Sequence, residues 1–117
     1  MRFIAFAAAA ALLSGPAMAE LVKVDDQTKF VQLVNGKTLT RPLVKLTVSP
    51  DGRIVGRVAR WDIEGTWSWR DGYFCRDLFW GGDALGYNCQ EVQATADGRI
   101  KFTSDQGAGD SAMFRLR

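Results

Sequence analysis

The sequence predicts an all-β fold, a small antiparallel β-barrel or a strongly curled sheet of about eight strands with one disulfide, and a β-sandwich is the alternative. Apolar and polar residues alternate along segments such as 44–48 and 100–102, a period typical of half-buried antiparallel strands. Asp-Gly pairs separate several of these segments, and after residue 20 there is no convincing helical period. Closure is favoured because a closed sheet leaves no edge exposed.

The N-terminal residues follow the order of a secretory signal peptide. Arg2 supplies a positive charge, an uncharged apolar run follows, and residues 17–19 form a small-residue cleavage site. The run is too short to span a bilayer, and no second apolar stretch follows it. We therefore expect a signal peptide at 1–19, cleavage near Ala19-Glu20, and one all-β domain at 20–117 that is periplasmic or secreted and has no membrane anchor.

The predicted strands follow one another through this domain, and we expect some of the shorter ones to merge. An Asn35-Gly36 pair predicts a hairpin turn after the second segment, and residues 80–86 are expected to form a glycine-rich loop. The segments are 21–24, 28–34, 37–41, 43–49, 53–59, 64–70, 73–79, 87–94, 99–104 and 111–117.

Three Asp-Gly pairs predict the hairpin registers. A three-residue loop with glycine at a bulge pairs Val48 with Ile54, whereas a two-residue loop mixes the faces in the first and third hairpins. We therefore expect the bulged turn in all three, and in the second hairpin this places Trp67 opposite Cys75. The pairs are Asp51-Gly52, Asp71-Gly72 and Asp97-Gly98.

Cys75 and Cys89 are expected to form a disulfide, because an even pair of cysteines in an exported chain is usually oxidised. The pair lacks the Cys-x-x-Cys spacing of redox-active sites. The predicted register places Trp67 and Trp69 on the inner face beside this disulfide, so these two indoles are assigned to the core.

The candidate binding residues are Arg76, Phe79 and Trp80. Phe79 and Trp80 lie at the start of the predicted glycine-rich loop, where large apolar side chains are difficult to bury. Aromatic and arginine side chains are common in contact surfaces. We therefore predict that these three residues bind a ligand or a protein partner.

The composition supplies little for catalysis. The chain has no histidine, and its formal net charge is +2. We therefore predict no catalytic residue, no metal site, no cofactor and no nucleic-acid partner.

These expectations favour a periplasmic, non-enzymatic binding or interaction module. Its partner would be an unknown protein or a small anionic or aromatic ligand. A small-ligand carrier, with its ligand in the mouth of the barrel, is the alternative. An enzyme acting through carboxylates is a disfavoured third hypothesis.

Three segments resemble a family of short exported proteins from alphaproteobacteria, and the similarity extends over most of the domain. Members of this family, whose function is not established, often carry the label dihydrodipicolinate reductase. That label implies a cytoplasmic, nicotinamide-dependent enzyme of well over twice this length. Export, length and the missing strand-turn-helix unit conflict with it, and we interpret the label as a misassignment. The segments are 65–76 (GTWSWRDGYFCR), 86–90 (GYNCQ) and 102–110 (FTSDQGAGD).

The predicted architecture is also similar to that of the periplasmic inhibitors of c-type lysozyme, which are small disulfide-bonded β-barrels with a signal peptide. Their inhibitory loop motif is absent from this sequence, so the likeness is one of size and class. It implies lysozyme inhibition as one version of the binding module.

Overall fold

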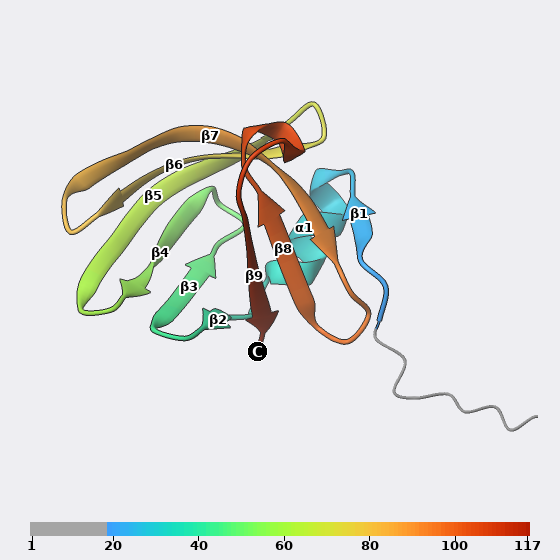
Figure 1. Ribbon diagram of the computed structural model, residues 1–117, viewed down its shortest axis with the longest axis horizontal. Helices are drawn as coiled ribbons and strands as arrows, with labels where there is room; N and C mark the ends of the chain where they lie inside the picture. Colours follow the sequence, from blue (N-terminus) through green and yellow to red (C-terminus); the bar gives the residue numbers. More distant parts are fainter. Residues whose placement is uncertain (1–18) are drawn as a thin grey trace, which may run out of the picture.

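Eight antiparallel strands close into a barrel in the computed structural model, and a ninth strand is added outside the ring (Figure 1). The structure describes residues 19–117, and the predicted signal peptide lies outside them. The elements are β1 (Val22–Val24), α1 (Gln27–Val34), β2 (Leu39–Arg41), β3 (Val44–Val48), β4 (Arg53–Val58), β5 (Trp61–Arg70), β6 (Tyr73–Trp80), β7 (Asp83–Ala94), β8 (Arg99–Thr103), the short 3-10 helix η1 (Asp105–Gly107) and β9 (Ser111–Leu116).

The ring follows the order β7-β6-β5-β4-β3-β2-β9-β8 and closes where β8 returns to β7. Strand β7 is long enough to pair with three other strands. The first part of β7 pairs with β6, and its last residues lie between β8 and the extra strand β1. The predicted small antiparallel β-barrel is therefore confirmed.

The first and third Asp-Gly hairpins have the predicted bulged turns. Val48 lies opposite Ile54, and Ala94 lies opposite Ile100. In both turns the glycine has a positive φ, +94° at Gly52 and +95° at Gly98, a region that glycine enters without steric cost.

The predicted register of the second hairpin is wrong by one residue. Asp71 and Gly72 form a two-residue loop with both φ values positive, so Trp67 lies opposite Arg76 instead of Cys75. Trp67 and Trp69 do point into the core, but Cys75 and its disulfide lie on the outer face of the sheet. Alternation could not distinguish the two registers, because each places an aromatic residue opposite Trp69: Tyr73 in the predicted register and Phe74 in the observed one.

Residues 28–34, predicted to be a strand, belong to helix α1. Asp26 begins the helix, and its carboxylate accepts a hydrogen bond from the backbone N–H of Lys29 at 2.8 Å. Asn35-Gly36 ends the helix instead of forming a hairpin turn. Phe30 and Val34, one helical turn apart, are fully buried. Among residues 19–117, no helix is long and apolar enough to cross a membrane.

Helix α1 closes one end of the barrel. Its Phe30 ring lies 5.0 Å from the ring of Phe74 and 5.2 Å from those of Trp67 and Trp69. The core therefore forms where the helix meets the inner faces of β5, β6 and β8. The opposite end, at the left of Figure 1, carries the β2–β3, β4–β5 and β6–β7 turns.

The glycine-rich loop predicted at 80–86 is a tight hairpin. Gly81 and Gly82 form the turn with positive φ values, β6 continues to Trp80, and β7 begins at Asp83. The strands extend this far because β5 and β7 both supply hydrogen-bonding partners to the end of β6. The aromatic residues predicted to lie in a loop therefore lie on a strand.

Candidate functional site

The three predicted binding residues alternate along β6, and this alternation separates them. Arg76 and Trp80 point toward the interior of the barrel, on the same side as Phe74 and Leu78. Phe79 points outward and is 39% exposed. The structure therefore brings Arg76 and Trp80 to one interior site and leaves Phe79 on the opposite surface.

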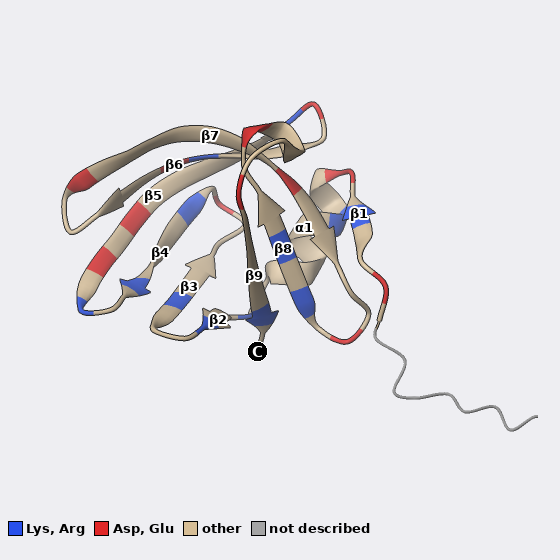
Figure 2. Ribbon diagram, viewed as in Figure 1, with Lys and Arg blue, Asp and Glu red and all other residues tan. Residues whose placement is uncertain are grey.

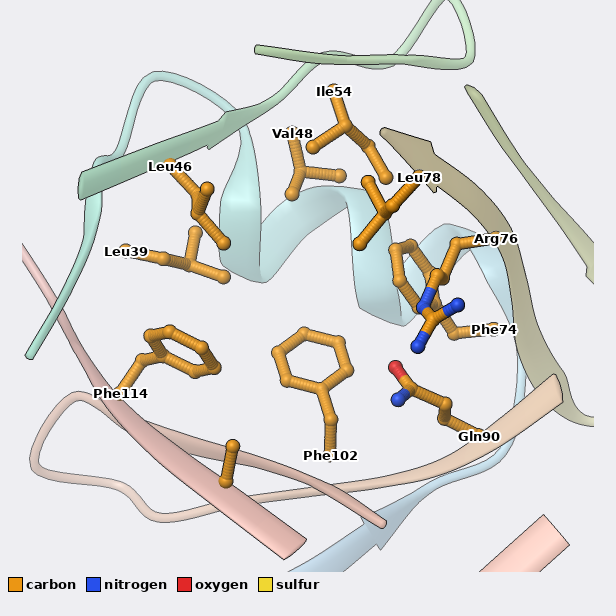
Figure 3. Close-up of a pocket in the computed structure, with 11 residues that line it drawn as sticks. Leu39, Leu46, Val48, Ile54, Phe74, Arg76, Leu78, Gln90, Phe102 and Phe114 are labelled. Atoms are coloured by element: carbon orange, nitrogen blue, oxygen red, sulfur yellow. The ribbon is translucent and has the colours of Figure 1, made fainter. Parts of the chain in front are cut away.

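The interior of the barrel contains a cavity of about 130 Å³, between helix α1 and the end of the barrel that the helix does not close. Figure 3 shows its side chains converging from the surrounding strands, with the helix behind them. Nine of the eleven lining residues are apolar and two, Arg76 and Gln90, are polar. The apolar residues are Leu39, Leu46, Val48, Ile54, Phe74, Leu78, Phe102, Ala112 and Phe114.

Arg76 supplies the positive charge of this cavity. The residue is half-buried, and its Nη1 donates a hydrogen bond of 2.7 Å to the backbone oxygen of Gly86. Burial lowers the pKa of the guanidinium, and the neighbouring carboxylate of Asp77 opposes this effect. The group remains protonated at neutral pH, because arginine loses its proton only at very high pH. Within residues 19–117, no ion pair includes Arg76.

Gln90 completes a polar corner of the cavity, and its amide points toward Arg76 in Figure 3. Its Nε2 donates to the hydroxyl of Ser104 at 3.2 Å, which leaves the side-chain oxygen as an acceptor. Two residues earlier, Asn88 exchanges hydrogen bonds with Asp105. These amides fix the loop between β8 and β9 beside the polar corner.

Gln90 and Asn88 were absent from the predicted site. A signal was nevertheless present in the alternation. Gln90, Val92 and Ala94 are alternate residues of one strand, so Gln90 shares their inward face. A polar residue at an inward position of a barrel strand costs free energy unless it is hydrogen-bonded, so it indicates either a network or a site.

The cavity opens into an apolar mouth of about 490 Å³, and the two share Leu46, Leu78 and Phe114 as lining residues. Trp80 lines this mouth, and its indole N–H donates to the backbone oxygen of Val58 at 3.2 Å. Leu43, in the β2–β3 turn, lies at the rim and is 78% exposed. Apart from Arg41, the mouth thus presents apolar surface to solvent, whereas the polar corner lies deeper.

The predicted disulfide joins Cys75 to Cys89, which lie directly opposite each other on β6 and β7. Cys75 is buried although it belongs to the outer face, and Cys89 is partly exposed. A disulfide in a small domain is consistent with an oxidising, exported location.

The arrangement is suited to binding. A half-buried guanidinium with spare N–H donors can bind a carboxylate, phosphate or sulfonate, and the surrounding apolar wall can hold a hydrocarbon group. Among residues 19–117, no group of three or more His, Cys, Asp or Glu side chains is placed to hold a metal ion.

Comparisons with known proteins add no further information. No protein-family model matches the chain, and neither the curated proteins nor the solved structures contain a match.

Proposed function

We propose that this protein is a periplasmic carrier or receptor for a small amphipathic anion, bound in the mouth of the barrel with its charged group at Arg76. The observation that carries the proposal is the position of Arg76, a half-buried cation without an ion-pair partner among residues 19–117, in the wall of a cavity whose other lining residues are apolar except for Gln90. Burying an uncompensated charge costs free energy, and a bound anion would offset that cost.

The volume of the cavity limits the size of the ligand. A dry, apolar cavity of about 150 Å³ is large enough for benzene, so the deep cavity of about 130 Å³ would accept a small ring or a short alkyl segment. The rest of the ligand would occupy the apolar mouth beside Trp80 and Leu43. Short-chain and aromatic carboxylates have this combination of size and charge.

Matched pairs of ligands test the proposal. Isothermal calorimetry would compare hexanoate with hexanol and benzoate with benzyl alcohol, and wild-type protein is expected to prefer each anion. Arg76→Met keeps an unbranched apolar side chain and removes the charge. It should weaken anion binding about tenfold or more, because a hydrogen bond to a charged group contributes about 1.5–3 kcal/mol, and it should change binding of the alcohols little.

A second variant tests the location. Ala112 lines the cavity, and Ala112→Leu would fill it and weaken all four ligands together. Native mass spectrometry of protein purified from its own host would detect a bound small molecule directly. A bare mass, together with no heat from any of the four ligands, would reject the carrier; equal losses of anions and alcohols in Arg76→Met would reject the role of the charge.

An interaction module remains a second candidate, supported by apolar side chains on the outer face. Phe79 and Val55 lie on either side of Glu64 in adjacent strands and are 39% and 38% exposed. Phe79→Ser should release a protein partner without changing the cavity. Lysozyme inhibition is one version, and an assay with excess purified protein that shows full lysozyme activity would remove it.

A further inference from the structure

Basic residues form a continuous row on the outer face of the barrel. Arg99 of β8 lies opposite Arg115 of β9, Arg115 lies opposite Thr40 of β2, and the row continues through Lys45 of β3 to Arg57 of β4. Residues opposite each other in a sheet have their side chains on the same face. Four of the five positions in this cationic row (Arg99, Arg115, Thr40, Lys45 and Arg57) are therefore positively charged.

The row contains two direct like-charge pairs, Arg99 with Arg115 and Lys45 with Arg57. Such pairs destabilise a sheet. In the described part of the chain, carboxylates pair with the row only at its two ends, where Asp97 lies 3.4 Å from Arg99 and Asp62 lies 3.2 Å from Arg57. Within residues 19–117, no ion pair involves the two central cations.

The centre of the row is hollowed into an open groove of about 640 Å³. Lys45, Arg99 and Arg115 line it together with Arg41 and Arg117, and no acidic residue does. Figure 2 shows the charge on these strands: blue segments gather on β8, β9, β2, β3 and β4, which carry no red, whereas red segments lie on β5, on β7 and in the connecting turns and loops. The net charge of the chain, +2, conceals this separation.

We propose that the cationic row binds a flexible, linear anionic polysaccharide, which lies across the strands and contacts the row and its groove. The row does not overlap the ligand site, since Lys45 and Arg115 line neither the cavity nor its mouth, although the groove adjoins that mouth and shares Arg41, Pro42 and Phe114 with it. Its charge complements a chain carrying repeated carboxylate or sulfate groups, and four steps between neighbouring strands give a footprint of roughly 19 Å.

The curvature of the barrel favours a flexible chain over a flat membrane. Five adjacent strands make up more than half of an eight-stranded ring, so the two ends of the row face in different directions. A planar bilayer cannot contact both ends at once, whereas a polysaccharide can follow the surface. The row also contains no aromatic residue, and single-stranded nucleic acids are usually bound by stacking on aromatic side chains.

Heparin and polygalacturonate serve as probes, one sulfated and one carboxylated. Wild-type protein should bind at least one of them, with an affinity that falls about tenfold or more between roughly 50 and 200 mM salt, because binding to a polyanion releases counterions. Lys45→Gln/Arg115→Gln should bind at least about tenfold more weakly with a smaller salt dependence, since it removes two contacts. Both positions are exposed, so the fold should be retained.

The control variant Lys23→Gln/Arg70→Gln removes the same charge from exposed positions on β1 and β5. It should bind like the wild type, and an equal loss would attribute binding to net charge and overturn the proposal. Failure of the wild-type protein to bind either polysaccharide at low salt would also overturn it. So would tighter, row-dependent binding to phosphatidylglycerol vesicles or to single-stranded DNA. Hexanoate binding should be unchanged in both double variants, which separates this test from that of the carrier.

Discussion

At the scale of single residues, two tryptophans in one core differ in their polar contacts. The Trp67 indole N–H donates to the backbone oxygen of Ser49 at 2.9 Å. The Trp69 indole N–H is buried and has no partner among the described residues. Both rings pack on Phe30, at the same centroid distance of 5.2 Å. The two indoles therefore differ in hydrogen bonding, and Trp67 also packs on Phe74, with ring centroids 5.6 Å apart.

Trp67→Phe should reduce the free energy of unfolding more than Trp69→Phe does. Both substitutions remove similar volume, but only the first removes a hydrogen bond, which contributes about 1 kcal/mol. Urea unfolding of the two variants should give a difference of about that size. An equal or larger loss in Trp69→Phe would show that the buried indole N–H of Trp69 has a partner in solution.

Asp97 gives the third hairpin turn a pH dependence. The Thr95 hydroxyl donates to its carboxylate, and this bond, followed by that from Arg99, lowers the pKa of Asp97 below its ordinary value of 3.8. A lowered folded-state pKa stabilises the fold fully above the unfolded pKa, and this contribution is lost as the pH falls through the folded value. The loss is therefore expected below about pH 3.8.

Thr95→Val tests this coupling. The substitution removes the hydroxyl donor, so an NMR titration should show the pKa of the Asp97 carboxyl rising toward its ordinary value. An unchanged pKa would mean that Arg99, not Thr95, sets it.

At the scale of elements, helix α1 depends on Asp26. Asp26→Ala should reduce the free energy of unfolding by about 1 kcal/mol, because it leaves an N–H in the first turn without its capping acceptor. Asp25 provides the matched control, because it makes only an exposed ion pair with Lys29 at 3.4 Å. Asp25→Ala should reduce the free energy of unfolding by less than about 0.5 kcal/mol. Thermal unfolding of the two variants, measured side by side, checks the difference. Equal losses would assign the effect to charge and not to capping.

The sequence allowed most strands to be predicted, and the reasons for the failures are physical. Alternation identifies a strand when one face is buried and the other is wet, as in β3 and β8. It failed at α1 because an eight-residue helix shows barely two turns of periodicity. Asp26 and the spacing of Phe30 and Val34 were the available signals, but Asn35-Gly36 was interpreted as a hairpin turn.

The candidate site was harder to predict than the strands. The sequence predicts Trp80 in a loop and Arg76 on the strand before it, both as parts of a contact surface, yet both line the interior, one in the cavity and one in its mouth. Side-chain direction depends on the pairing register, and the register of the second hairpin was one residue off. The cationic row was also hidden in the sequence, because its two parts, on β8–β9 and on β2–β4, are joined only by the long-range pairing of β2 with β9.

At the scale of the whole molecule, the disulfide is a single covalent link in a barrel otherwise held by pairing and packing. Cys75→Ala/Cys89→Ala should lower the free energy of unfolding by about 3 kcal/mol, because the closed loop restricts the unfolded chain. The barrel should still form, since β6 pairs with β7 on both sides of the bond and with β5 along its other edge. Near-native circular dichroism with a lower urea midpoint is expected. A variant that remains unfolded at low temperature would show that the link is required for folding.

The disulfide lies directly behind the polar corner of the cavity, and this position links its oxidation to the proposed binding site. Cys75 precedes Arg76 in the chain, and Cys89 lies between Asn88 and Gln90, so the bond on the outer face crosses the two strands where the polar corner is built on the inner one. Oxidation therefore fixes the spacing of the groups that would receive the charged end of a ligand. In a reducing environment the same chain lacks this constraint. On the proposed function, the oxidation of the two cysteines and the completion of the binding corner are thus the same chemical event.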